Sequence, residues 1–573
     1  MHYQWNLLEV EDEQEVKRLA KELNISEILC RLLILRGIKT FDQSKLFFRP
    51  SLEHLHDPYL MKDMHIAIER IKTAMNNHEK ILIYGDYDVD GTTAVSVVYD
   101  FLSKRYAEID YYIPDRYTEG YGVSFQGIDY AVDHDFKLII TLDCGIKAVE
   151  KIEYAQSKGI DVIICDHHTP GEQLPPACAI INPKQKDCPY PFKELPGCGI
   201  GFKLIQAFAL KENIDLKKTY HHLDLVAVAI ACDIVPITGE NRVIAYYGLK
   251  KINDNKASDG IRALLDIAQS KKPKVSVEDL VFKVGPRINA AGRIEHGKRA
   301  VELLIHPNPE TIEAVATAID EKNAIRRGID QQITAEALAM VEENQQFKEA
   351  KSTVLYKEDW HKGVIGIVAS RLIESYYRPT IVFTQSNGVA AGSARSVKNY
   401  NVYDAIDACS ELIEQFGGHK YAAGLTIKIE NIEPFRKKFE EVVSSTISAQ
   451  MLVPEIEIDA EINFQDITPK FIRILNQFAP FGPHNMRPVF ITRNVIDAEY
   501  TALVGQDKKH IKFYVHQLPS MLAKMKGIGF NLGEHFDRIK TGEKFDMVYT
   551  IEENHWNGEV RYEMNVRDIR FSE

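Results

Sequence analysis

The stretch "ILIYGDYDVDGTTA", residues 81–94, joins a short apolar run to three aspartates at alternate positions. The run "ILIY" has the length and composition of a buried β-strand. Asp86, Asp88 and Asp90 follow it, and the glycine and threonines behind them begin a segment with helical patterning. A strand, a tight loop and a helix in this order are typical of a βαβ unit in a parallel sheet.

Two further apolar runs end in the same way. "KLIITLD" ends at Asp143 and "DVIICD" ends at Asp166, and helix-like segments separate the runs. Because open parallel sheets bind ligands outside the carboxyl ends of their strands, we expect these carboxylates and that of Asp86 to face one crevice. The pattern therefore predicts an α/β fold with a site at that edge of the sheet.

The acidic loop crowds three carboxylates into five residues, and these repel one another unless a cation neutralises them. An EF-hand loop begins with the same spacing, but its twelfth position, counted from Asp86, requires glutamate and is Val97 here. Its flanks would also be two helices rather than a strand and a helix. A polar loop or a helix N-cap is the plain alternative, and a divalent-metal site is the interpretation that the pattern favours.

Histidine and aspartate side chains elsewhere would complete such a site. "CDHHTP", residues 165–170, places His167 and His168 directly after an apolar run. Asp233 ends the helical pattern of "LVAVAIACD", where a carboxylate is unfavourable beside the helix dipole and indicates a compensating cation. Oxygen and nitrogen donors without thiolate suit Mn²⁺ or Mg²⁺ better than structural zinc. Paired ions of this kind activate water and stabilise phosphoryl displacement.

The chain of 573 residues has 45% hydrophobic and 27% charged residues, as in ordinary globular proteins, and its length suits about three to five domains. No apolar run approaches the roughly 20 residues of a membrane span and no secretory leader is visible, so we expect no membrane association. Eight scattered cysteines without a C-x-x-C pair indicate free thiols in a reducing, cytoplasmic setting. The net charge of −12 argues against an indiscriminate nucleic-acid coat but allows a local basic groove.

Beyond the first domain the periodicity changes three times. Residues 312–344 contain no proline and one glycine, which predicts a helix of roughly 50 Å that bridges domains. Residues 350–448 again alternate strand and helix patterns, which predicts a second α/β domain. From residue 454 the pattern alternates strand by strand, which predicts a small antiparallel barrel. Its aromatic residues Phe513, Tyr514, Tyr549 and Trp556 could stack on bases, although at strand spacing each is more often a core residue.

Several of these motifs resemble those of a known family. "GDYDVDG", "TLDCGI", "DHH" and "ACDIVP" are similar to the four motifs of the DHH phosphoesterase family. "VGPRINAAGR", "GSARS" and "GGHKYAAG" resemble the RecJ branch of that family, with its DHHA1 domain. "QFAPFGPHNMRPVF" resembles the start of that branch's OB-fold, except that His484 and Met486 replace the usual glycine and proline. The resemblance covers residues 60–573.

The resemblance implies a domain division. It implies a parallel-sheet DHH catalytic domain, a long connecting helix, a second α/β domain of DHHA1 type, and a C-terminal β-barrel of OB-fold type that binds nucleic acid. The expected bounds are 1–60 for an N-terminal region, 61–305 for the catalytic domain, 306–346 for the helix, 347–450 for the DHHA1 domain and 451–573 for the barrel.

The resemblance also implies a role for each acidic and histidine residue. The implied metal ligands are Asp86, Asp88, Asp90, Asp143, His167 and Asp233. Asp86 would be a ligand or a close support, and Asp143 would bridge two ions. His168 would be catalytic together with Asp143 and would face the scissile phosphate. Members of this branch typically use Mn²⁺, with Mg²⁺ as the alternative.

A third set of residues would bind substrate. The resemblance implies His168, Arg287, Arg293, Ser393, Arg395 and His419. Apart from His168, they lie in or beside glycine-rich stretches, where the backbone can approach phosphate closely. A surface ion pair is the plain alternative for each arginine. Ser393 and Arg395 would hold the 5′-terminal phosphate, which would give the enzyme its polarity.

The resemblance, together with the metal motifs, implies a 5′→3′ exonuclease that degrades single-stranded DNA to 5′-mononucleotides by two-metal phosphodiester hydrolysis, in DNA repair and recombination. Single-strand-binding protein and a helicase are the expected partners, and a monomer is the expected state. A phosphodiesterase for short oligonucleotides or cyclic dinucleotides, a manganese pyrophosphatase and an inactive DNA-binding scaffold are the alternatives. The first two would not need about 120 residues of barrel, and the scaffold would have lost acidic motifs that are all present here.

Overall fold

A computed structural model describes residues 3–269, 273–294, 296–306, 308–521, 523–556 and 559–571. The chain forms two compact units. The smaller unit contains Met1–Leu7 and Lys322–Glu457, and the larger unit contains Leu8–Glu321 and Ile458–Glu573. Among the described helices, none has the combination of length and apolar character that crossing a membrane requires.

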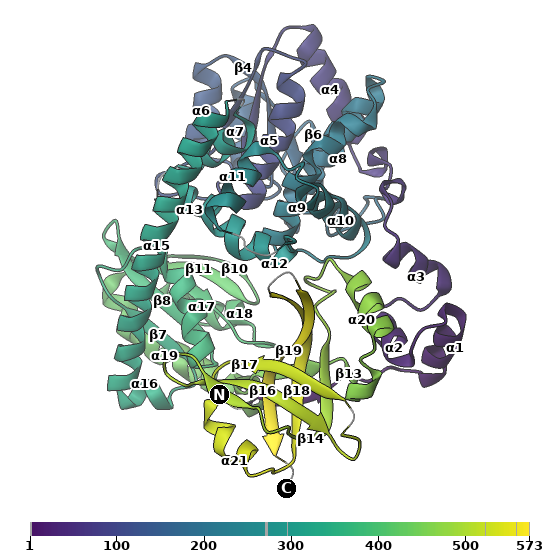
Figure 1. The fold of residues 1–573 in the computed structure, drawn as a ribbon. Helices are drawn as coiled ribbons and strands as arrows, with labels where there is room; N and C mark the ends of the chain where they lie inside the picture. Colours follow the sequence, from purple (N-terminus) through teal and green to yellow (C-terminus); the bar gives the residue numbers. More distant parts are fainter. Residues whose placement is uncertain are drawn as a thin grey trace. The chain divides into compact units, whose positions relative to one another are not determined.

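The larger unit contains the predicted parallel sheet (Figure 1). Its strand order is β3-β2-β4-β5-β6, and every neighbouring pair is parallel. The strands are β2 (Lys80–Gly85), β3 (Ile109–Tyr112), β4 (Phe136–Leu142), β5 (Asp161–Cys165) and β6 (Ala179–Ile181). The α/β fold that the apolar runs predict is therefore confirmed. Asp86, Asp143 and Asp166 each follow the last residue of a strand.

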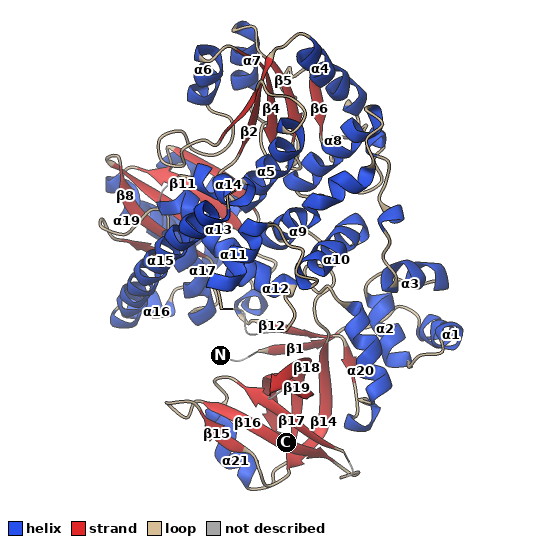
Figure 2. Ribbon diagram, turned by 45° about the horizontal axis from the view of Figure 1, so that its top comes forward, coloured by secondary structure: helices blue, strands red, loops and turns tan. Residues whose placement is uncertain are grey.

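Helices cover both faces of this sheet (Figure 2). Ile81 and Ile83 pack on one face with helices α4 (Met64–Asn76), α5 (Val89–Ser103) and α8 (Gly197–Lys211). Leu82 and Tyr84 pack on the other face with α6 (Phe125–Asp133) and α7 (Val149–Ser157). Because successive residues of a strand point to opposite faces, a strand that is covered on both sides must be apolar throughout. That requirement explains the uninterrupted run "ILIY".

A second layer of helices follows the sheet in the chain. It contains α9 (Leu223–Cys232), α10 (Gly239–Asn253), α11 (Asp259–Ile267), a π-helical turn at Leu280–Val284, α13 (Gly285–Ile294) and α14 (Lys298–Ile305). Helix α9 is buried over nearly its whole length, which agrees with its almost purely apolar sequence. The predicted long helix is α15, at Pro309–Glu343, and the boundary between the two units falls within it.

The C-terminal part of the larger unit is a closed barrel. Its ring of paired strands runs β14-β18-β19-β17-β16 and returns to β14. The strands are β14 (Val489–Asp497), β16 (His510–Gln517), β17 (Lys524–Gly529), β18 (Phe545–Trp556) and β19 (Glu559–Phe571). The pairing of β17 with β19 is parallel, unlike the antiparallel barrel that the alternation predicts. The chain reaches β18 through α21 (Phe536–Lys540), and β19 then returns beside β17 in the same direction.

Three N-terminal helices share a core with this barrel. They are α1 (Glu13–Leu23), α2 (Glu27–Leu35) and α3 (Phe41–Phe48). Leu19 and Leu33 of this region belong to the same buried cluster as Phe490 and Tyr549 of the barrel. The core also contains Phe513, so two of the aromatic residues considered for base stacking are structural.

The smaller unit has a mixed sheet of order β10-β11-β9-β8-β7. Its strands are β7 (Thr353–Tyr356), β8 (Thr380–Ser386), β9 (Val389–Arg395), β10 (Gln415–His419) and β11 (Ala422–Ile427). The pair β7 and β8 is parallel, and the other pairs are antiparallel. Helix α17 (Ile365–Ser375) contacts β8 and β9, and α19 (Ile432–Thr446) contacts β7. The second α/β domain is thereby confirmed.

Candidate active site

The three aspartates behind β2 occupy different positions. Asp86 is fully buried, and its carboxylate accepts a hydrogen bond from the Gly122 amide at 3.0 Å. Asp88 is the N-cap of α5 and accepts a hydrogen bond from the Gly91 amide at 3.0 Å. The N-cap contact therefore occupies one carboxylate oxygen of Asp88, and it leaves Asp86 and Asp90 unexplained.

Asp90 is held by the start of another helix. The amides of Gly197 and Cys198, at the start of α8, donate to its two carboxylate oxygens at 2.6 and 2.8 Å. A Cβ atom on Gly197 would lie 2.5 Å from the Asp143 Cβ, so the close approach of α8 requires glycine there. The sequence signal for this approach is the stretch "LPGCGIG", which motif and periodicity alone do not connect with the site.

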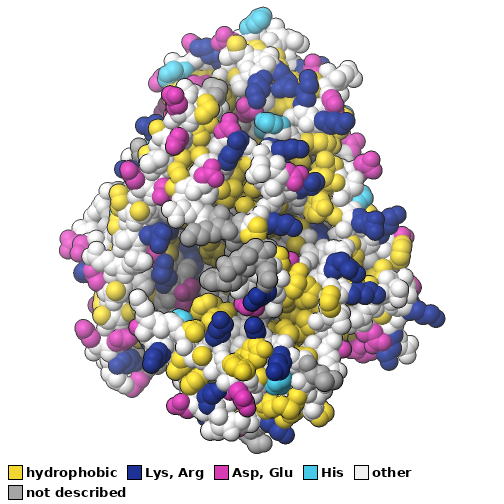
Figure 3. Space-filling view, viewed as in Figure 1, with side chains coloured by type: hydrophobic (Ala, Val, Ile, Leu, Met, Phe, Trp, Pro, Cys, Tyr) yellow, Lys and Arg dark blue, Asp and Glu magenta, His cyan; other side chains and the backbone are white. Residues whose placement is uncertain are grey.

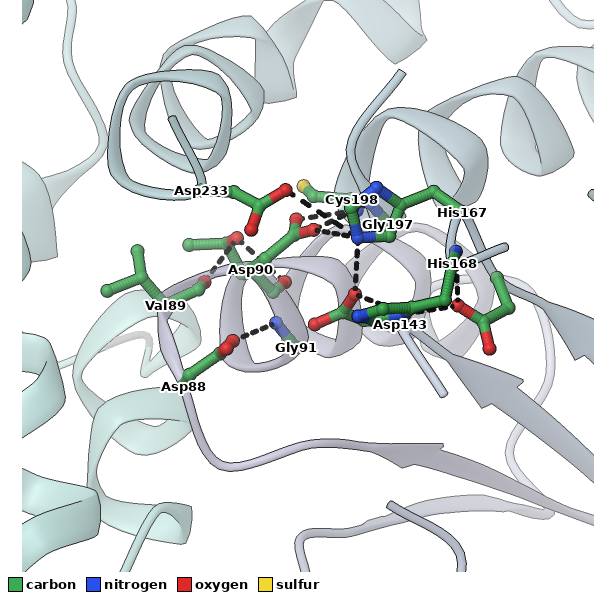
Figure 4. A network of polar contacts seen from close by, with 12 residues as sticks. Asp88, Val89, Asp90, Gly91, Asp143, His167, His168, Gly197, Cys198 and Asp233 are labelled. Carbon is green, nitrogen blue, oxygen red and sulfur yellow. Dashed lines mark hydrogen bonds and ion pairs between the residues drawn. The ribbon is translucent and has the colours of Figure 1, made fainter. Parts of the chain in front are cut away.

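Three carboxylates from the start of α5, the end of β4 and the end of α9 converge on His167 (Figure 4). The His167 Nε2 lies 3.2 Å from Asp143 Oδ1, 3.6 Å from Asp233 Oδ2 and 3.8 Å from Asp90 Oδ2. These residues form two groups, and the ligand atoms within each group lie within 4.8 Å of one another. One group is Asp143 with His167 and His168, and the other is Asp90 with His167 and Asp233. Four of the predicted metal ligands are thus in direct proximity, and His167 belongs to both groups.

The donor atoms of this centre fit divalent cations. Asp86 Oδ2, Asp143 Oδ1, Asp233 Oδ2 and His167 Nδ1 are buried without a hydrogen-bond partner among the described residues. Buried polar atoms are normally satisfied, so the unsatisfied oxygens of Asp143 and Asp233, which both lie within 3.6 Å of His167 Nε2, indicate a missing positive charge. Carboxylates and imidazole without thiolate are the ligands that Mn²⁺ and Mg²⁺ accept.

The electrostatics of the centre lead to the same conclusion. Burial and repulsion between carboxylates raise the pKa of Asp86, Asp143 and Asp233 well above the usual aspartate range, and that of Asp90 to about 7. Burial and the neighbouring His168 lower the pKa of His167 to about 3, so this imidazole is neutral and able to ligate. The carboxylates cannot all remain ionised in this position without a counter-charge.

His168 is oriented by Asp166, for which the motifs had predicted no role of its own. The Nδ1 and the backbone amide of His168 donate to Asp166 Oδ1, at 2.7 and 3.1 Å. The Ile146 amide donates to the other Asp166 oxygen at 2.9 Å. Burial alone would lower the pKa of His168, but the Asp166 carboxylate raises that pKa overall. The side chain is 43% exposed, and its Nε2 lies 3.3 Å from the hydroxyl of Tyr121, a residue that none of the sequence motifs indicates.

Helix α13 packs closely against two segments that carry predicted metal ligands. A Cβ atom on Gly292 would lie 2.7 Å from the backbone oxygen of Tyr87, between Asp86 and Asp88. A Cβ atom on Gly285 would lie 2.6 Å from the Cys232 Sγ, next to Asp233. The motif "VGPRINAAGR" therefore lies against the backbone of Tyr87 in one acidic segment and against the side chain of Cys232 beside Asp233 in the other.

The two arginines of that motif differ in their surroundings. The Arg287 Nε lies 2.8 Å from Asp320 Oδ1 on α15, so the ion-pair alternative describes this arginine. Arg293 accepts a hydrogen bond at its backbone oxygen from the Tyr117 hydroxyl. A substrate-binding role for either arginine stays a prediction.

In the smaller unit, the other predicted substrate-binding residues lie on one face of the sheet. Arg395, Ala422 and His419 are paired across β9, β11 and β10, and Ser393, Gly424 and Gly417 form the next row on the same face. A Cβ atom on Gly366, in the first turn of α17, would lie 2.9 Å from Ser393 Oγ and 3.1 Å from Arg395 Nη2. The half-buried Arg395 has no carboxylate partner among the described residues, and its pKa is lowered by burial alone. A helix N-terminus, a hydroxyl and this guanidinium together favour an anion.

Comparison with protein families agrees with this arrangement. The model of the DHH family, N-terminal domain, matches residues 80–230, the DHHA1 domain matches residues 349–445, and the RecJ OB domain matches residues 458–568. The parallel sheet and its acidic and histidine centre thus define a phosphoesterase of the DHH class, joined here to a DHHA1 domain and an OB-fold.

Individual relatives narrow the class. The single-stranded-DNA-specific exonuclease RecJ of Bacillus subtilis is 37% identical over 564 residues, which are 98% of this chain and 70% of the relative. The enzyme of the same name in Escherichia coli is 30% identical over 563 residues, 95% of each chain. The chain belongs to the RecJ family of single-stranded-DNA-specific exonucleases.

Two solved structures share the fold. The match with the crystal structure of RecJ in complex with Mn²⁺ from Thermus thermophilus covers 100% of this chain and 80% of the solved chain. Its TM-score is 0.83 at 24% identity. A crystal structure of exonuclease RecJ bound to manganese covers 70% of this chain and 98% of that one, with a TM-score of 0.60 at 28% identity.

Proposed function

We propose that the protein is a metal-dependent exonuclease that degrades single-stranded DNA in the 5′→3′ direction to 5′-mononucleotides. Membership of the RecJ family supports the substrate and the reaction class. The observation that carries the chemistry is the pair of ligand groups around His167, with the unsatisfied oxygens of Asp143 and Asp233 beside its ring nitrogen. In this proposal the domain bounds are those expected from the motifs, with the catalytic domain at residues 61–305.

We assign the centre to two Mn²⁺ ions, with Mg²⁺ as the alternative. Asp90, His167 and Asp233 would hold one ion, Asp143 would bridge, and Asp86 and Asp88 would complete the other. When bound, the ions would neutralise the carboxylates and supply Lewis acidity for in-line displacement at phosphorus.

His168 is the group that we assign to the scissile phosphate. The Asp166 carboxylate fixes its ring through Nδ1, which leaves Nε2 on the exposed side of the centre. Because Asp166 favours the protonated ring, His168 would donate to a phosphate oxygen there and offset the charge that develops during displacement. The hydroxyl of Tyr121 would keep the ring from rotating.

We assign the polarity of the reaction to the smaller unit. Ser393, Arg395 and His419, with the N-terminus of α17, would bind a 5′-terminal phosphate. Recognition of a terminal phosphate monoester there would select the 5′ end, because an internal phosphate is a diester with one more esterified oxygen. We further propose that the enzyme acts as a monomer in DNA repair and recombination, on strands supplied by a helicase and coated by single-strand-binding protein.

The test uses single-stranded oligonucleotides labelled at either end, with Mn²⁺ present. We expect immediate release of labelled mononucleotide from the 5′ label, slow loss of the 3′ label and no attack on blunt duplex. Asp143→Asn should abolish release, while Asp187→Asn, at an exposed aspartate paired with Lys62 at 2.7 Å, should not change it. Cleavage confined to fragments of two to five nucleotides would instead indicate the short-oligonucleotide phosphodiesterase, and binding without cleavage would indicate a scaffold.

A further inference from the structure

The chain leaves helix α9 through an unusual residue. Asp233 is the C-cap of α9, and the next residue, Ile234, has a backbone φ of +59°. This left-handed conformation suits glycine, because a Cβ atom comes too close to the following carbonyl oxygen, and it is least suited to a β-branched side chain. Of the non-glycine residues with positive φ that the structure describes, Ile234 is the only apolar one.

Other helices of the larger unit show which residues this position ordinarily holds. Helices α2, α4, α6, α7, α8, α10 and α11 end in the same way, with a left-handed residue directly after the C-cap. Those residues are Gly37, His78, Asp135, Gly159, Asn213, Asn255 and Gln269. Glycine and asparagine are the usual residues at such a position. Ile234 differs from all of them, and among these eight helix ends only that of α9 carries a predicted metal ligand.

Neither packing nor hydrogen bonding explains an isoleucine in this conformation. Ile234 is 67% exposed, so little apolar contact within the protein offsets the strain. At the end of α8 the Ile214 amide closes the turn by donating to the Ala209 oxygen at 2.8 Å, and α2, α4, α7 and α10 end with the same kind of bond. Val235 is the corresponding residue after α9, and its amide makes no such backbone hydrogen bond among the described residues. A glycine in place of Ile234 would therefore suit the fold at least as well.

The position of Ile234 beside the metal centre is informative. Hydrophobic side chains lie among charged ones over the face shown in Figure 3, so exposure of an apolar side chain alone indicates nothing. The carboxylate of Asp233, however, points toward His167, with Oδ2 3.6 Å from His167 Nε2 (Figure 4). The Asp233 side chain is 27% exposed, so solvent reaches this edge of the centre. Because neighbouring Cα atoms are about 3.8 Å apart, the Ile234 side chain begins within reach of a nucleotide whose phosphate lies at the ions.

We propose that Ile234 is a substrate-contacting residue, whose side chain packs against the sugar or base of the nucleotide held at the metal centre. An aliphatic side chain gains from covering the apolar surface of a nucleoside, and it offers no hydrogen bond that would select one base over another. The strained conformation is then retained because glycine and asparagine, which suit the backbone, provide no such contact.

This inference rests on the proposed function, because it presupposes a nucleotide at the metal centre. A conformational role is the alternative, in which a stiff β-branched residue would hold Asp233 in place for the ions. Contact with substrate is the better explanation, because asparagine would fix the same turn with less strain. The contact is also distinct from the base stacking considered for the barrel, where the side chain of Trp556 lies outside the described residues.

The test compares the full-length protein with Ile234→Gly and Ile234→Asn, which keep the turn and remove the apolar contact. Binding to dT12 with phosphorothioate linkages, which resist hydrolysis, is measured by fluorescence anisotropy with Mn²⁺, and cleavage of ordinary dT12 gives KM and kcat. We expect both variants to bind roughly tenfold more weakly and to raise KM by a similar factor, with kcat within about twofold, because ground state and transition state share the contact. Ile234→Val, which keeps an apolar β-branched side chain, should restore most of the lost affinity.

Two measurements without DNA separate substrate contact from a structural role. Isothermal titration with Mn²⁺ should give the same affinity for the parent, Ile234→Gly and Ile234→Asn. Their thermal midpoints should equal or exceed that of the parent, because the strain is relieved. Asn213→Ile is the matched control, since it places isoleucine at the corresponding position after α8. It should lower the thermal midpoint and leave KM unchanged.

The outcomes distinguish the alternatives. Unchanged affinity for DNA and unchanged KM in the glycine and asparagine variants would overturn the proposal. Weaker Mn²⁺ binding in these variants would overturn it as well, because Ile234 would then act on Asp233 rather than on the substrate. A lower thermal midpoint in them would assign the side chain to the fold. Failure of the parent to cleave dT12 would instead contradict the proposed function, while the comparison of phosphorothioate binding would still decide the role of Ile234.

Discussion

Among single residues, the buried pair of Lys203 and Glu240 is especially sensitive to substitution. The Lys203 Nζ lies 2.6 Å from Glu240 Oε1, and the two side chains are 0% and 1% exposed. Glu240 also accepts hydrogen bonds from the Tyr190 hydroxyl at 2.6 Å and from the His56 amide at 2.9 Å. The pair therefore connects α8, α10 and the segment that precedes α4.

We expect Lys203→Met to lower the free energy of unfolding by about 3–5 kcal/mol, because it leaves the Glu240 carboxylate buried without a cation. The double variant Lys203→Met/Glu240→Gln should regain part of that loss, since glutamine still accepts from Tyr190 and carries no charge. Urea unfolding of the parent and both variants measures the difference. Equal losses in the single and double variants would show that packing, not charge, sets the cost.

Glu336 makes a contribution to the stability of the folded protein that depends on pH. Hydrogen bonds from Lys357 Nζ at 2.8 Å and Trp360 Nε1 at 2.9 Å lower its pKa to about 2. A carboxylate whose pKa is lower in the folded state stabilises that state above its unfolded pKa, and the stabilisation is lost as the pH falls toward the folded value. We expect Glu336→Gln to cost less than about 1 kcal/mol at pH 7, because the group is near the surface.

The thermal midpoints of the parent and Glu336→Gln should approach one another as the pH falls from about 5 to 2, the window between the two pKa values. Differential scanning calorimetry across that range measures the convergence. A difference that stays constant with pH would mean that shape and not ionisation accounts for the effect of the substitution.

At the scale of elements, helix α13 sets the distance between two acidic segments. Gly292→Ala would place a Cβ atom 2.7 Å from the backbone oxygen of Tyr87, so either the helix or the acidic loop must shift. We expect this variant to bind Mn²⁺ more weakly. Displaced ligands that cost about 1.4 kcal/mol of binding free energy would lower the affinity roughly tenfold. Isothermal titration with Mn²⁺ measures this without requiring catalysis.

A glycine on another helix gives the matched control. Gly328 lies on α15, and a Cβ atom there would meet nothing within 4 Å among the described residues. Gly328→Ala should leave Mn²⁺ affinity unchanged and stabilise the helix by up to about 1 kcal/mol. Comparable Mn²⁺ affinity in Gly292→Ala and the control would remove α13 from any role at the metal centre.

The elements also show where prediction from sequence succeeded and where it could not. The runs ending at Asp86, Asp143 and Asp166 predicted the parallel sheet and its functional edge, because a strand covered on both faces must be apolar and its end must be polar. The role of Asp166 was not predictable, because a strand-end aspartate can bind metal, cap a helix or hold a histidine with the same local sequence. The contact of Gly292 with Tyr87 joins residues that are about 200 positions apart, and periodicity carries no information about such pairs.

Two other differences between the sequence-based expectations and the structure also arise from contacts between residues that are far apart in the chain. The parallel pairing of β17 with β19 depends on how the chain crosses the barrel, and strand alternation alone does not specify direction. The ion pair of Arg287 with Asp320 was only one of two alternatives from sequence, because a motif fixes a residue type and not its neighbours.

At the scale of the larger unit, one arginine attaches the barrel to the helices beside the sheet. Arg242 on α10 donates to the backbone oxygens of Gln477, Phe478, Ala479 and Pro480, at 2.8–3.4 Å, and to that of Phe47 at 3.1 Å. Burial and the nearby Arg36 lower its pKa to about 9. The motif "QFAPFGPHNMRP" therefore presents carbonyl groups to a buried cation, and its Asn485 accepts a further hydrogen bond from Arg36 at 2.9 Å.

We expect Arg242→Ala to reduce the free energy of unfolding by at least about 3 kcal/mol, because several charge-assisted hydrogen bonds to buried carbonyls are lost together. Calorimetry should also show the barrel unfolding separately from the sheet and its helices. Arg493→Ala, which removes exposed pairs with Glu461 and Asp546 at 2.9 Å each, should cost no more than about 1 kcal/mol and keep a single transition. An Arg242→Ala protein that unfolds like the control would show that apolar packing alone attaches the barrel.

In the proposed two-ion centre, Asp143 and His167 would differ in how many ions they serve. The Asp143 carboxylate has two oxygens and can serve both ions, whereas the single Nε2 of His167, within 3.8 Å of Asp90, Asp143 and Asp233, can serve only one. Asp143→Ala would therefore remove a ligand from both ions, and His167→Ala would remove a ligand from one. In Mn²⁺ titrations we expect the first variant to weaken every binding step and the second to leave one step near its original affinity. The consequence is evolutionary: a substitution at the bridging carboxylate would impair both ions together, whereas one at His167 would leave a half-loaded protein on which selection can still act.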